Sequence, residues 1–323
     1  MRALVQTGVG GTDVLRTADL PVPEVRAGTL LVRVTAIGLN FHDVENRRRG
    51  EEGLAFPTVP GTDVVGVVEE TGPGVTDFAP GDRVVALARG GGCAEYALAW
   101  ARTAAKLPDG VDDALAAGIP TAGLTAWFLL ERFVPAGTRA VAAYAAAGGV
   151  GHWLGGLLAR RPVRSIGLVS SPRKAELARA AGWTHTVDRT ADPVRAVRRA
   201  AWGYGACVVL DPVAGPGFAD SFRMLRPGGT AVLYGRAGGP PDLGELPAAF
   251  LDVRRNLGLR TWFLGRELTL SAKEIAPALR ELVAEAAAGR ITLPVTELPL
   301  SAARHAHALL ESGSSEGKLV LRP

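Results

Sequence analysis

The sequence is poor in cysteine and in lysine. Of its 323 residues only two are cysteines, Cys93 and Cys207. Two cysteines exclude a disulfide scaffold and a structural zinc lobe built on four cysteines, and they fit a reducing cytoplasm. Only four of the 36 Lys and Arg residues are Lys. The arginines are scattered rather than gathered in a stripe, so the net charge of +4 does not predict nucleic-acid binding.

The sequence also has no apolar run that predicts a membrane span. The N-terminus lacks an apolar core long enough for a signal peptide, so we expect a cytoplasmic protein. Residues 140–159 are uncharged, but they contain five glycines, His152 and Trp153, and are rich in Ala rather than Leu. A strand, a glycine turn and a helix explain this stretch better than a membrane span does.

Aromatic residues are scarce, at 6%, whereas apolar residues make up 47% and charged residues 21%. These last two values are close to those of ordinary globular proteins, so a disordered or fibrous chain is excluded. The length predicts about two domains. The 41 glycines follow no repeating period, so they are expected to mark turns and special backbone positions.

The first third of the chain has the pattern of a β domain. Residues 30–36, 63–69 and 83–87 are β-branched runs, and turn sequences rich in Pro and Gly separate them. Short strands at this spacing favour a small barrel.

After residue 118, strand and helix patterns alternate, which predicts βαβ units and a parallel sheet. We expect strands at 139–143, 163–169, 207–210 and 230–234, and helices at 151–160, 173–181 and 218–225, the last closed by Pro227-Gly228-Gly229. The tail predicts a helix at 272–288 interrupted at Pro277, a surface helix at 302–312 carrying His305 and His307, and an apolar stretch at 318–321. The expected domains are 1–118, 119–260 and a return to the first domain over 261–323.

The most informative motif is the loop Ala145-Ala-Ala-Gly-Gly-Val-Gly151, between an expected strand and an expected helix. This context is the one required of a dinucleotide-binding fingerprint, in which glycine lets the backbone approach a pyrophosphate at a helix N-terminus. Ala146 takes the first glycine position, and Gly148 and Gly151 keep the spacing. The alternative is a purely structural strand–helix turn.

A second signal lies about 20 residues further on. An NAD site usually carries an Asp or Glu there for the ribose hydroxyl. This chain has Ser170-Ser171-Pro172-Arg173-Lys174 instead. Hydroxyls and cations suit a 2′-phosphate, so NADPH is favoured over NADH. Ser171 also fits a helix N-cap with Pro172 at the first helical position, and both functions are compatible.

With these motifs in place, nearly the whole chain resembles the zinc-independent medium-chain dehydrogenase/reductases, especially quinone oxidoreductases and polyketide enoyl reductase domains. The resemblance implies a GroES-like β-barrel catalytic domain, a Rossmann doubly wound parallel-sheet domain, NADPH as cofactor, and a homodimer. Its markers are segments 38–43 (GLNFHD), 60–63 (PGTD), 80–84 (PGDRV), 92–96 (GCAEY), 145–151 (AAAGGVG), 225–229 (LRPGG), 306–312 (AHALLES) and 317–318 (GK).

The resemblance also implies which residues bind the cofactor. Ser170 and Lys174 match contacts to the 2′-phosphate, Arg189 stands where a Tyr is common near the adenosine phosphate, and Asn40 matches an Asn near the nicotinamide ribose. Thr125, Gly235 and the pair Trp262–Phe263 match positions on the nicotinamide side. The loop residues of this set are Ala147, Gly148, Gly149, Val150 and Gly151.

The resemblance further implies that no zinc is bound. Zinc-dependent relatives carry Cys at the position of Asn40 and His at the position of Thr62, and neither Asn nor Thr is a good zinc ligand. Other positions depart from the family. Glu45 replaces a common Tyr, and Tyr144 replaces a common His. The helix after the glycine loop normally begins with a small residue and carries a Gln, and His152, Trp153 and Gly156 replace that pattern. For His152 and Trp153 we favour helix packing over closure on the pyrophosphate.

The expected reaction is hydride transfer from NADPH to an acceptor that is already activated, a quinone or an α,β-unsaturated carbonyl, possibly in secondary metabolism. The proton comes from water or from His42 or Glu45, the two candidate catalytic side chains. The alternatives are reduction of a ketone or aldehyde, and a non-redox NADPH-binding protein such as a cyclase. We expect a small-molecule substrate and neither a nucleic-acid nor a membrane partner.

Overall fold

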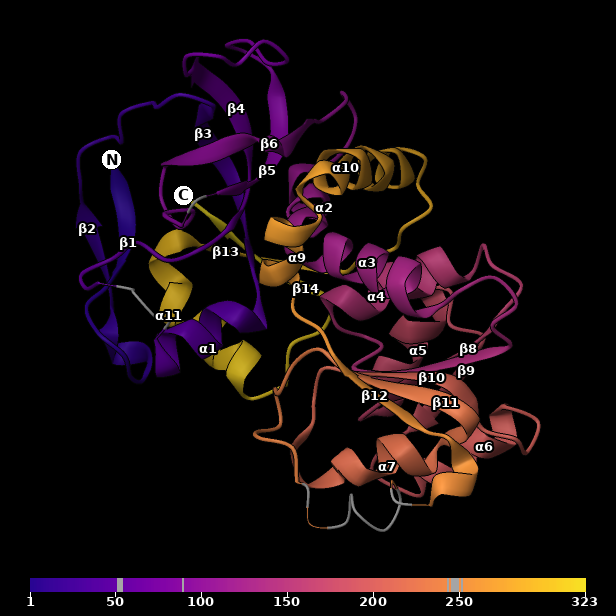
Figure 1. Cartoon of the computed structure of the whole chain (residues 1–323). Coiled ribbons are helices and arrows are strands. Elements are labelled where there is room, and N and C mark those ends of the chain that lie inside the picture. Colours follow the sequence, from indigo (N-terminus) through magenta and orange to yellow (C-terminus); the bar gives the residue numbers. More distant parts are fainter. Residues whose placement is uncertain (51–54, 89, 243, 245–249, 251) are drawn as a thin grey trace. The chain divides into compact units, whose positions relative to one another are not determined.

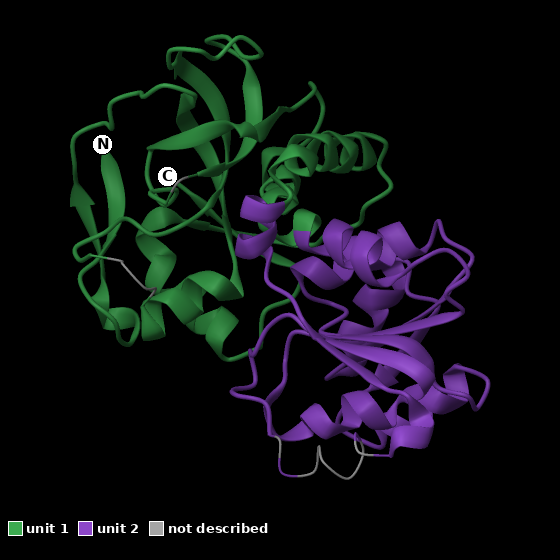
Figure 2. Ribbon diagram, viewed as in Figure 1, with its two compact units in different colours: residues 1–124, 271–323 green, residues 125–270 purple. Residues whose placement is uncertain are grey.

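The fold is that of a computed structural model, which describes residues 1–50, 55–88, 90–242, 244, 250 and 252–323. The chain forms two compact units (Figure 2). Unit 1 comprises residues 1–124 and 271–323, and unit 2 comprises residues 125–270. The chain therefore leaves the first unit once and returns to it.

Unit 1 is built on a small barrel. The strands β3 (Thr29–Leu39), β4 (Asp63–Thr71), β5 (Arg83–Ala88) and β6 (Tyr96–Lys106) pair antiparallel in order, and β6 pairs back onto β3. β14 (Lys318–Arg322) and β13 (Val295–Pro299) extend the sheet from β3. The hairpin of β1 (Arg2–Gln6) and β2 (Leu15–Asp19) is a separate sheet. This arrangement confirms the expected GroES-like barrel.

In its described residues, unit 1 also contains the α-helices α1 (Phe41–Arg49), α2 (Asp113–Ala116), α10 (Ala272–Ala287) and α11 (Ala303–Glu311). The expected interruption at Pro277 is wrong, because α10 runs through it. Buried Ile275, Leu279 and Leu282 hold one face of the helix against the unit, and this packing outweighs the one hydrogen bond that Pro removes.

The expectation of a surface position is wrong for His307. His305 is exposed, but His307 is only 1% exposed. Ala303, Ala306 and His307 have the spacing of one helix face, and this is the face that α11 buries.

Unit 2 contains a six-stranded parallel sheet in the order β12-β11-β10-β7-β8-β9. Its strands are β7 (Ala140–Tyr144), β8 (Arg164–Val169), β9 (His185–Asp188), β10 (Ala206–Asp211), β11 (Leu225–Leu233) and β12 (Gly258–Thr261). Numbered from β7, this is the 3-2-1-4-5-6 order of a doubly wound dinucleotide-binding fold, which confirms the expected Rossmann sheet. The order reverses between β7 and β10, and such switch points bind ligands at the carboxyl ends of the strands.

Helices cover both faces of this sheet, with α4 (Gly149–Leu158) on one face and α6 (Pro193–Ala200) and α7 (Phe218–Arg223) on the other (Figure 1). α3 (Leu124–Phe133), α5 (Pro172–Ala180) and α9 (Leu264–Leu270) are its other described helices. The expected closure of the 218–225 helix by Pro227-Gly228-Gly229 is wrong. α7 ends at Arg223, and the three residues form an irregularity within β11, where Gly228 has a φ of +76°.

In the described part of the chain, no helix combines the length and the apolar character needed to cross a membrane.

Candidate active site

The glycine loop connects β7 to α4 in unit 2. Gly148 is the N-cap of α4, and its N–H donates to the carbonyl of Ala145 at 2.9 Å. A Cβ on Gly151 would lie within 3.0 Å of backbone atoms of Ala145 and Ala146. Only glycine therefore lets the helix pack this closely on the loop. The result is a ten-residue helix whose first N–H groups follow a strand at the switch point, which is a geometry suited to an anion.

The two large side chains at the start of α4 are part of the core. His152 and Trp153 are both 0% exposed. The Nδ1 atom of His152 lies 2.9 Å from the carbonyl oxygen of Gly148, and burial lowers the pKa of this imidazole. The complete burial confirms the expected packing role, and it excludes closure of either side chain over a ligand on the surface of the loop.

The second predicted loop follows β8, the neighbour of β7. Ser171 is the N-cap of α5, and its hydroxyl accepts from the N–H of Lys174 at 3.2 Å, with Pro172 in the first turn. The expected capping role is thus confirmed. Ser170 and Lys174 are both half-buried. Because β7 and β8 are parallel neighbours, their carboxyl ends and the loops that follow lie at the same edge of the sheet.

Arg189 follows β9 at this same edge. Its N–H donates to the carbonyl of Val169 at 2.8 Å, which joins the ends of β9 and β8. Burial raises the pKa of Tyr144, and the charge of Arg189 opposes part of this rise. The Arg189 guanidinium therefore lies near Tyr144, at the end of β7. Among the described residues, the Arg189 guanidinium has no hydrogen bond or ion pair, and Arg189 is exposed. The edge thus presents a positive charge beside the glycine loop.

The residues predicted for the nicotinamide side also lie in unit 2. Thr125 is buried in α3, and a Cβ on Gly235 would meet the carbonyl oxygen of Pro212 at 2.7 Å. Trp262 follows β12, and its indole N–H donates to Glu267 at 3.0 Å. Phe263 is 53% exposed. Trp262 is therefore held by the protein, and about half of the Phe263 side chain is exposed.

Asn40 belongs to a network in unit 1 that sequence reasoning missed. The Lys318 ammonium donates to Asn40 Oδ1 at 2.6 Å and lies 3.3 Å from Asp63 Oδ2. Asn40 Nδ2 donates to the same carboxylate at 2.9 Å, and Thr121 donates to it from both its N–H and its hydroxyl. Lys318 is 3% exposed and Asp63 is 0% exposed. In the sequence, Asp63 and Lys318 are recognised only as parts of the family markers PGTD and GK. The rarity of lysine in this chain is the signal that points to Lys318.

Asp43 adds a second buried carboxylate on α1. Its Oδ2 accepts from the N–H of Asn40 at 2.7 Å, across the first turn of the helix. Burial raises the pKa of Asp43 to about 6, against the lowering effects of the Asn40 N–H, His42 and Lys318. The carboxylate of Asp43 is thus a costly charge at neutral pH, held by the end of the helix.

The candidate catalytic pair lies on the same helix. His42 and Glu45 are both half-buried, and His42 Nε2 lies 3.1 Å from Asn46 Nδ2, one turn further along α1. His42 therefore has a polar neighbour that holds its ring.

The residues at the zinc-ligand positions do not fit zinc. The Asn40 oxygen is bound by an ammonium, and the Thr62 hydroxyl lies 3.3 Å from Asp63 Oδ1. A divalent cation placed at this amide oxygen would be repelled by the charge of Lys318. The chemistry of these two side chains therefore does not suit a zinc ion.

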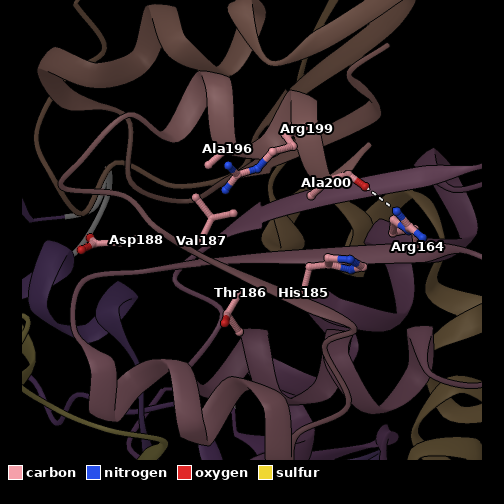
Figure 3. A pocket seen from close by; sticks show the side chains of 8 residues that line it. All are labelled: Arg164, His185, Thr186, Val187, Asp188, Ala196, Arg199 and Ala200. Atoms are coloured by element: carbon pink, nitrogen blue, oxygen red, sulfur yellow. Dashed lines mark hydrogen bonds between the residues drawn. The ribbon is translucent and has the colours of Figure 1, made fainter. Parts of the chain in front are cut away.

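Unit 2 has a pocket of about 430 Å³ between β9 and α6, to which Arg164 also contributes (Figure 3). Arg164 donates to the carbonyl of Ala200 at 2.8 Å, and the Arg199 guanidinium lies on the α6 side. No predicted site residue is among its lining residues, so this pocket is separate from the glycine loop.

Two family descriptions match the sequence. The "Alcohol dehydrogenase GroES-like domain" matches residues 26–109, and the "Zinc-binding dehydrogenase" matches residues 181–321. A 2-haloacrylate reductase of a Burkholderia species is 33% identical over 324 residues, which cover 97% of this chain and 96% of that protein.

Solved structures agree with these matches. A quinone oxidoreductase of Escherichia coli, in complex with NADPH, has a TM-score of 0.93 at 27% identity, with 100% of both chains covered. A mycobacterial protein in complex with NADPH has a TM-score of 0.90 at 36% identity, again with 100% of both chains covered. The likeness extends over both units.

Proposed function

The chain belongs to the medium-chain dehydrogenase/reductase family of oxidoreductases, with quinone oxidoreductases and 2-haloacrylate reductase among its relatives, and on this basis we propose that it is an NADPH-dependent reductase. The proposed acceptor is a quinone or an α,β-unsaturated carbonyl compound, reduced without zinc. Two solved relatives, at 36% and 27% identity, hold NADPH, which supports the choice of cofactor.

One observation in this chain carries the proposal. The carboxyl edge of the unit 2 sheet joins the Gly148–Gly151 loop at a helix N-terminus with Ser170, Lys174 and Arg189. The loop suits a pyrophosphate, and the hydroxyl and the two cations suit a 2′-phosphate better than a ribose hydroxyl. On the nicotinamide side we propose Thr125, Gly235, Trp262 and Phe263, together with Asn40 of unit 1.

NADPH, when bound, supplies the hydride. In an α,β-unsaturated acceptor, hydride adds to the β-carbon, the double-bond electrons move toward the carbonyl oxygen, and a proton then adds to the α-carbon. The product is the saturated carbonyl compound, with NADP⁺ as the oxidised product. The Asn40 amide oxygen already accepts from the Lys318 ammonium, so it does not suit a metal ion that would polarise an unactivated carbonyl. This favours an acceptor whose own conjugation stabilises the charge.

The proton comes from water or from a side chain of α1. Histidine is the side chain used most often as a general acid or base, and glutamate also serves in this role. We propose both as candidates. Full turnover in both Glu45→Gln and His42→Ala would assign the proton to water.

The proposal is tested in a single titration series. Quenching of tryptophan fluorescence measures the affinities for NADPH and NADH, and addition of enones and quinones is then followed by loss of NADPH absorbance. Tighter binding of NADPH, followed by acceptor-dependent oxidation, is the expected result. Failure to bind either nucleotide would refute the assignment of the glycine loop.

The same series separates the alternative functions. Oxidation of NADPH only by simple ketones or aldehydes would identify a carbonyl reductase. Tight binding without oxidation by any acceptor class would identify a non-redox role. A cytoplasmic location, a homodimer and a role in secondary metabolism are further proposals, of which the first rests on the two unpaired cysteines and the second on the family resemblance.

A further inference from the structure

Lys318 is a buried cation, and its hydrogen bond to the partly exposed Asn40 links it to the surface of unit 1. Its ammonium bonds Asn40 Oδ1 and Asp63 Oδ2, and both Lys318 and Asp63 are buried, whereas Asn40 is partly exposed. A molecule bound at this surface of unit 1 thus touches Asn40 and not Lys318. Any effect of Lys318 on such a molecule is transmitted by the Asn40 side chain.

The chemistry of the two partners fixes the orientation of the Asn40 amide. An ammonium only donates hydrogen bonds, and a carboxylate only accepts them. Asn40 lies between one of each, so its oxygen must face Lys318 and its nitrogen must face Asp63, with a second contact from Nδ2 to the Gly38 carbonyl at 3.3 Å. The flipped amide would place an oxygen against the carboxylate and an NH₂ against the ammonium.

The space around Lys318 suits a compact cation. A Cβ on Gly38 would lie 2.9 Å from Lys318 Cε and 3.0 Å from Asp63 Cβ, so these two side chains pack directly against Gly38. A planar guanidinium is wider than an ammonium and needs several acceptors in its own plane. The ammonium of lysine therefore suits this position better than a guanidinium does, in a chain where only four of the 36 Lys and Arg residues are Lys.

The strand that carries Lys318 does not depend on this side chain. β14 is held by its pairing with β13 and β3, in which Leu319 opposes Leu39, and by the bond from the Lys318 N–H to the Pro294 carbonyl. The ammonium is thus available for a role other than joining the strand to the barrel.

We propose that Lys318 is a positioning residue for hydride transfer, which holds the Asn40 amide in the one orientation that binds the nicotinamide half of NADPH. The inference rests on the proposed function, which assigns Asn40 to that half of the cofactor. It adds a residue that contacts neither cofactor nor substrate.

The test compares a single variant, which keeps the Lys318 ammonium, with a double variant that removes both buried charges. Lys318→Met alone leaves Asp63 unpaired in the core, which threatens folding. We therefore compare Asp63→Asn, in which Lys318 still donates to the amide but loses its carboxylate partner, with Asp63→Asn/Lys318→Met, which is neutral at both positions, and the thermal midpoint reports the cost of each change. Three quantities are measured: kcat/KM for NADPH, the inhibition constant of adenosine 2′,5′-bisphosphate, which carries only the adenosine half, and the thermal midpoint.

Loss of one charge-assisted hydrogen bond predicts a fall in kcat/KM of at least about 10-fold from the single to the double variant. The inhibition constant of the bisphosphate is expected to change less than about 2-fold, because that half of the cofactor does not reach Asn40. Equal kcat/KM in the two variants would overturn the role of Lys318, as would a parallel loss of bisphosphate binding. A wild-type protein that does not oxidise NADPH would instead overturn the proposed function itself.

Discussion

Replacement of His307 is expected to change how stability depends on pH. This imidazole is 1% exposed, and among the described residues neither of its ring nitrogens has a hydrogen-bond partner. Burial, and then the charge of Arg47, lower the pKa of His307 from 6.5 to about 4. Between the two pKa values, His307 is protonated in the unfolded chain but neutral in the folded chain. The free energy of unfolding therefore falls as the pH decreases from about 6.5 to about 4.

The size of the effect follows from the two pKa values. Their difference corresponds to about 3 kcal/mol of unfolding free energy between pH 7.5 and pH 4, at 1.36 kcal/mol for each pKa unit. In His307→Leu this contribution disappears, so the variant gains stability relative to the wild type as the pH is lowered. At pH 7.5 the change is expected to be small, because an unpaired buried imidazole is replaced by an apolar side chain.

Urea unfolding of both proteins between pH 4 and 8 measures this difference directly. His305→Leu is the matched control, since His305 lies on the same helix but is exposed. Contributions from all other groups are common to the proteins and cancel in the difference. A free-energy difference between His307→Leu and the wild type that stays constant with pH would refute the reasoning.

Three further predictions concern the two candidate site regions. Burial raises the pKa of Asp43 from 3.8 to about 6, so the wild type loses stability as the pH rises from about 4 to about 6. Relative to the wild type, Asp43→Asn should therefore gain up to about 3 kcal/mol in urea unfolding on going from pH 4 to pH 7.5. Gly151→Ala places a methyl group against the Ala145 backbone, so we expect it to lower the free energy of unfolding by about 1–3 kcal/mol and to abolish NADPH binding. For Gly148→Ala the nearest contact of the new methyl group would be 3.3 Å, so smaller effects are expected in thermal unfolding and in the NADPH titration. Lys174→Met should weaken NADPH at least about 10-fold and leave NADH unchanged in fluorescence titration.

The fold could be predicted largely because its signals are local. Each strand pattern, each helix pattern and the glycine loop involves only a short run of consecutive residues. Together they predicted the parallel sheet of unit 2. The errors have a common cause. In each case a local preference predicted one structure and tertiary packing produced another. The buried face of α10 overrides the effect of Pro277, and the buried face of α11 includes His307. The irregularity in β11 takes up Pro227-Gly228-Gly229.

The site was predictable only in part, for a similar reason. Ser170, Lys174 and the glycine loop lie within one βαβ unit, so their spacing in the sequence carries the information. The network of Asn40, Asp63 and Lys318 joins positions up to 278 residues apart. No spacing rule connects them, and the sequence alone does not distinguish a buried, hydrogen-bonded lysine from a lysine at the surface. Only the folded barrel, which pairs β14 with β3, brings them together.

Composition nevertheless contains a usable signal for such residues. Where arginine is the prevailing cation, a lysine marks a place at which the guanidinium does not serve equally well. Of the four lysines, Lys106 pairs with Asp82 at the surface and Lys273 is exposed, but Lys174 follows the N-cap of α5 beside the glycine loop, and Lys318 is buried against Asn40 and Asp63. Half of the rare cations thus lie in the two candidate site regions. For Lys318 the physical reason is the compact ammonium, which donates to Asn40 Oδ1 and lies 3.3 Å from Asp63 Oδ2.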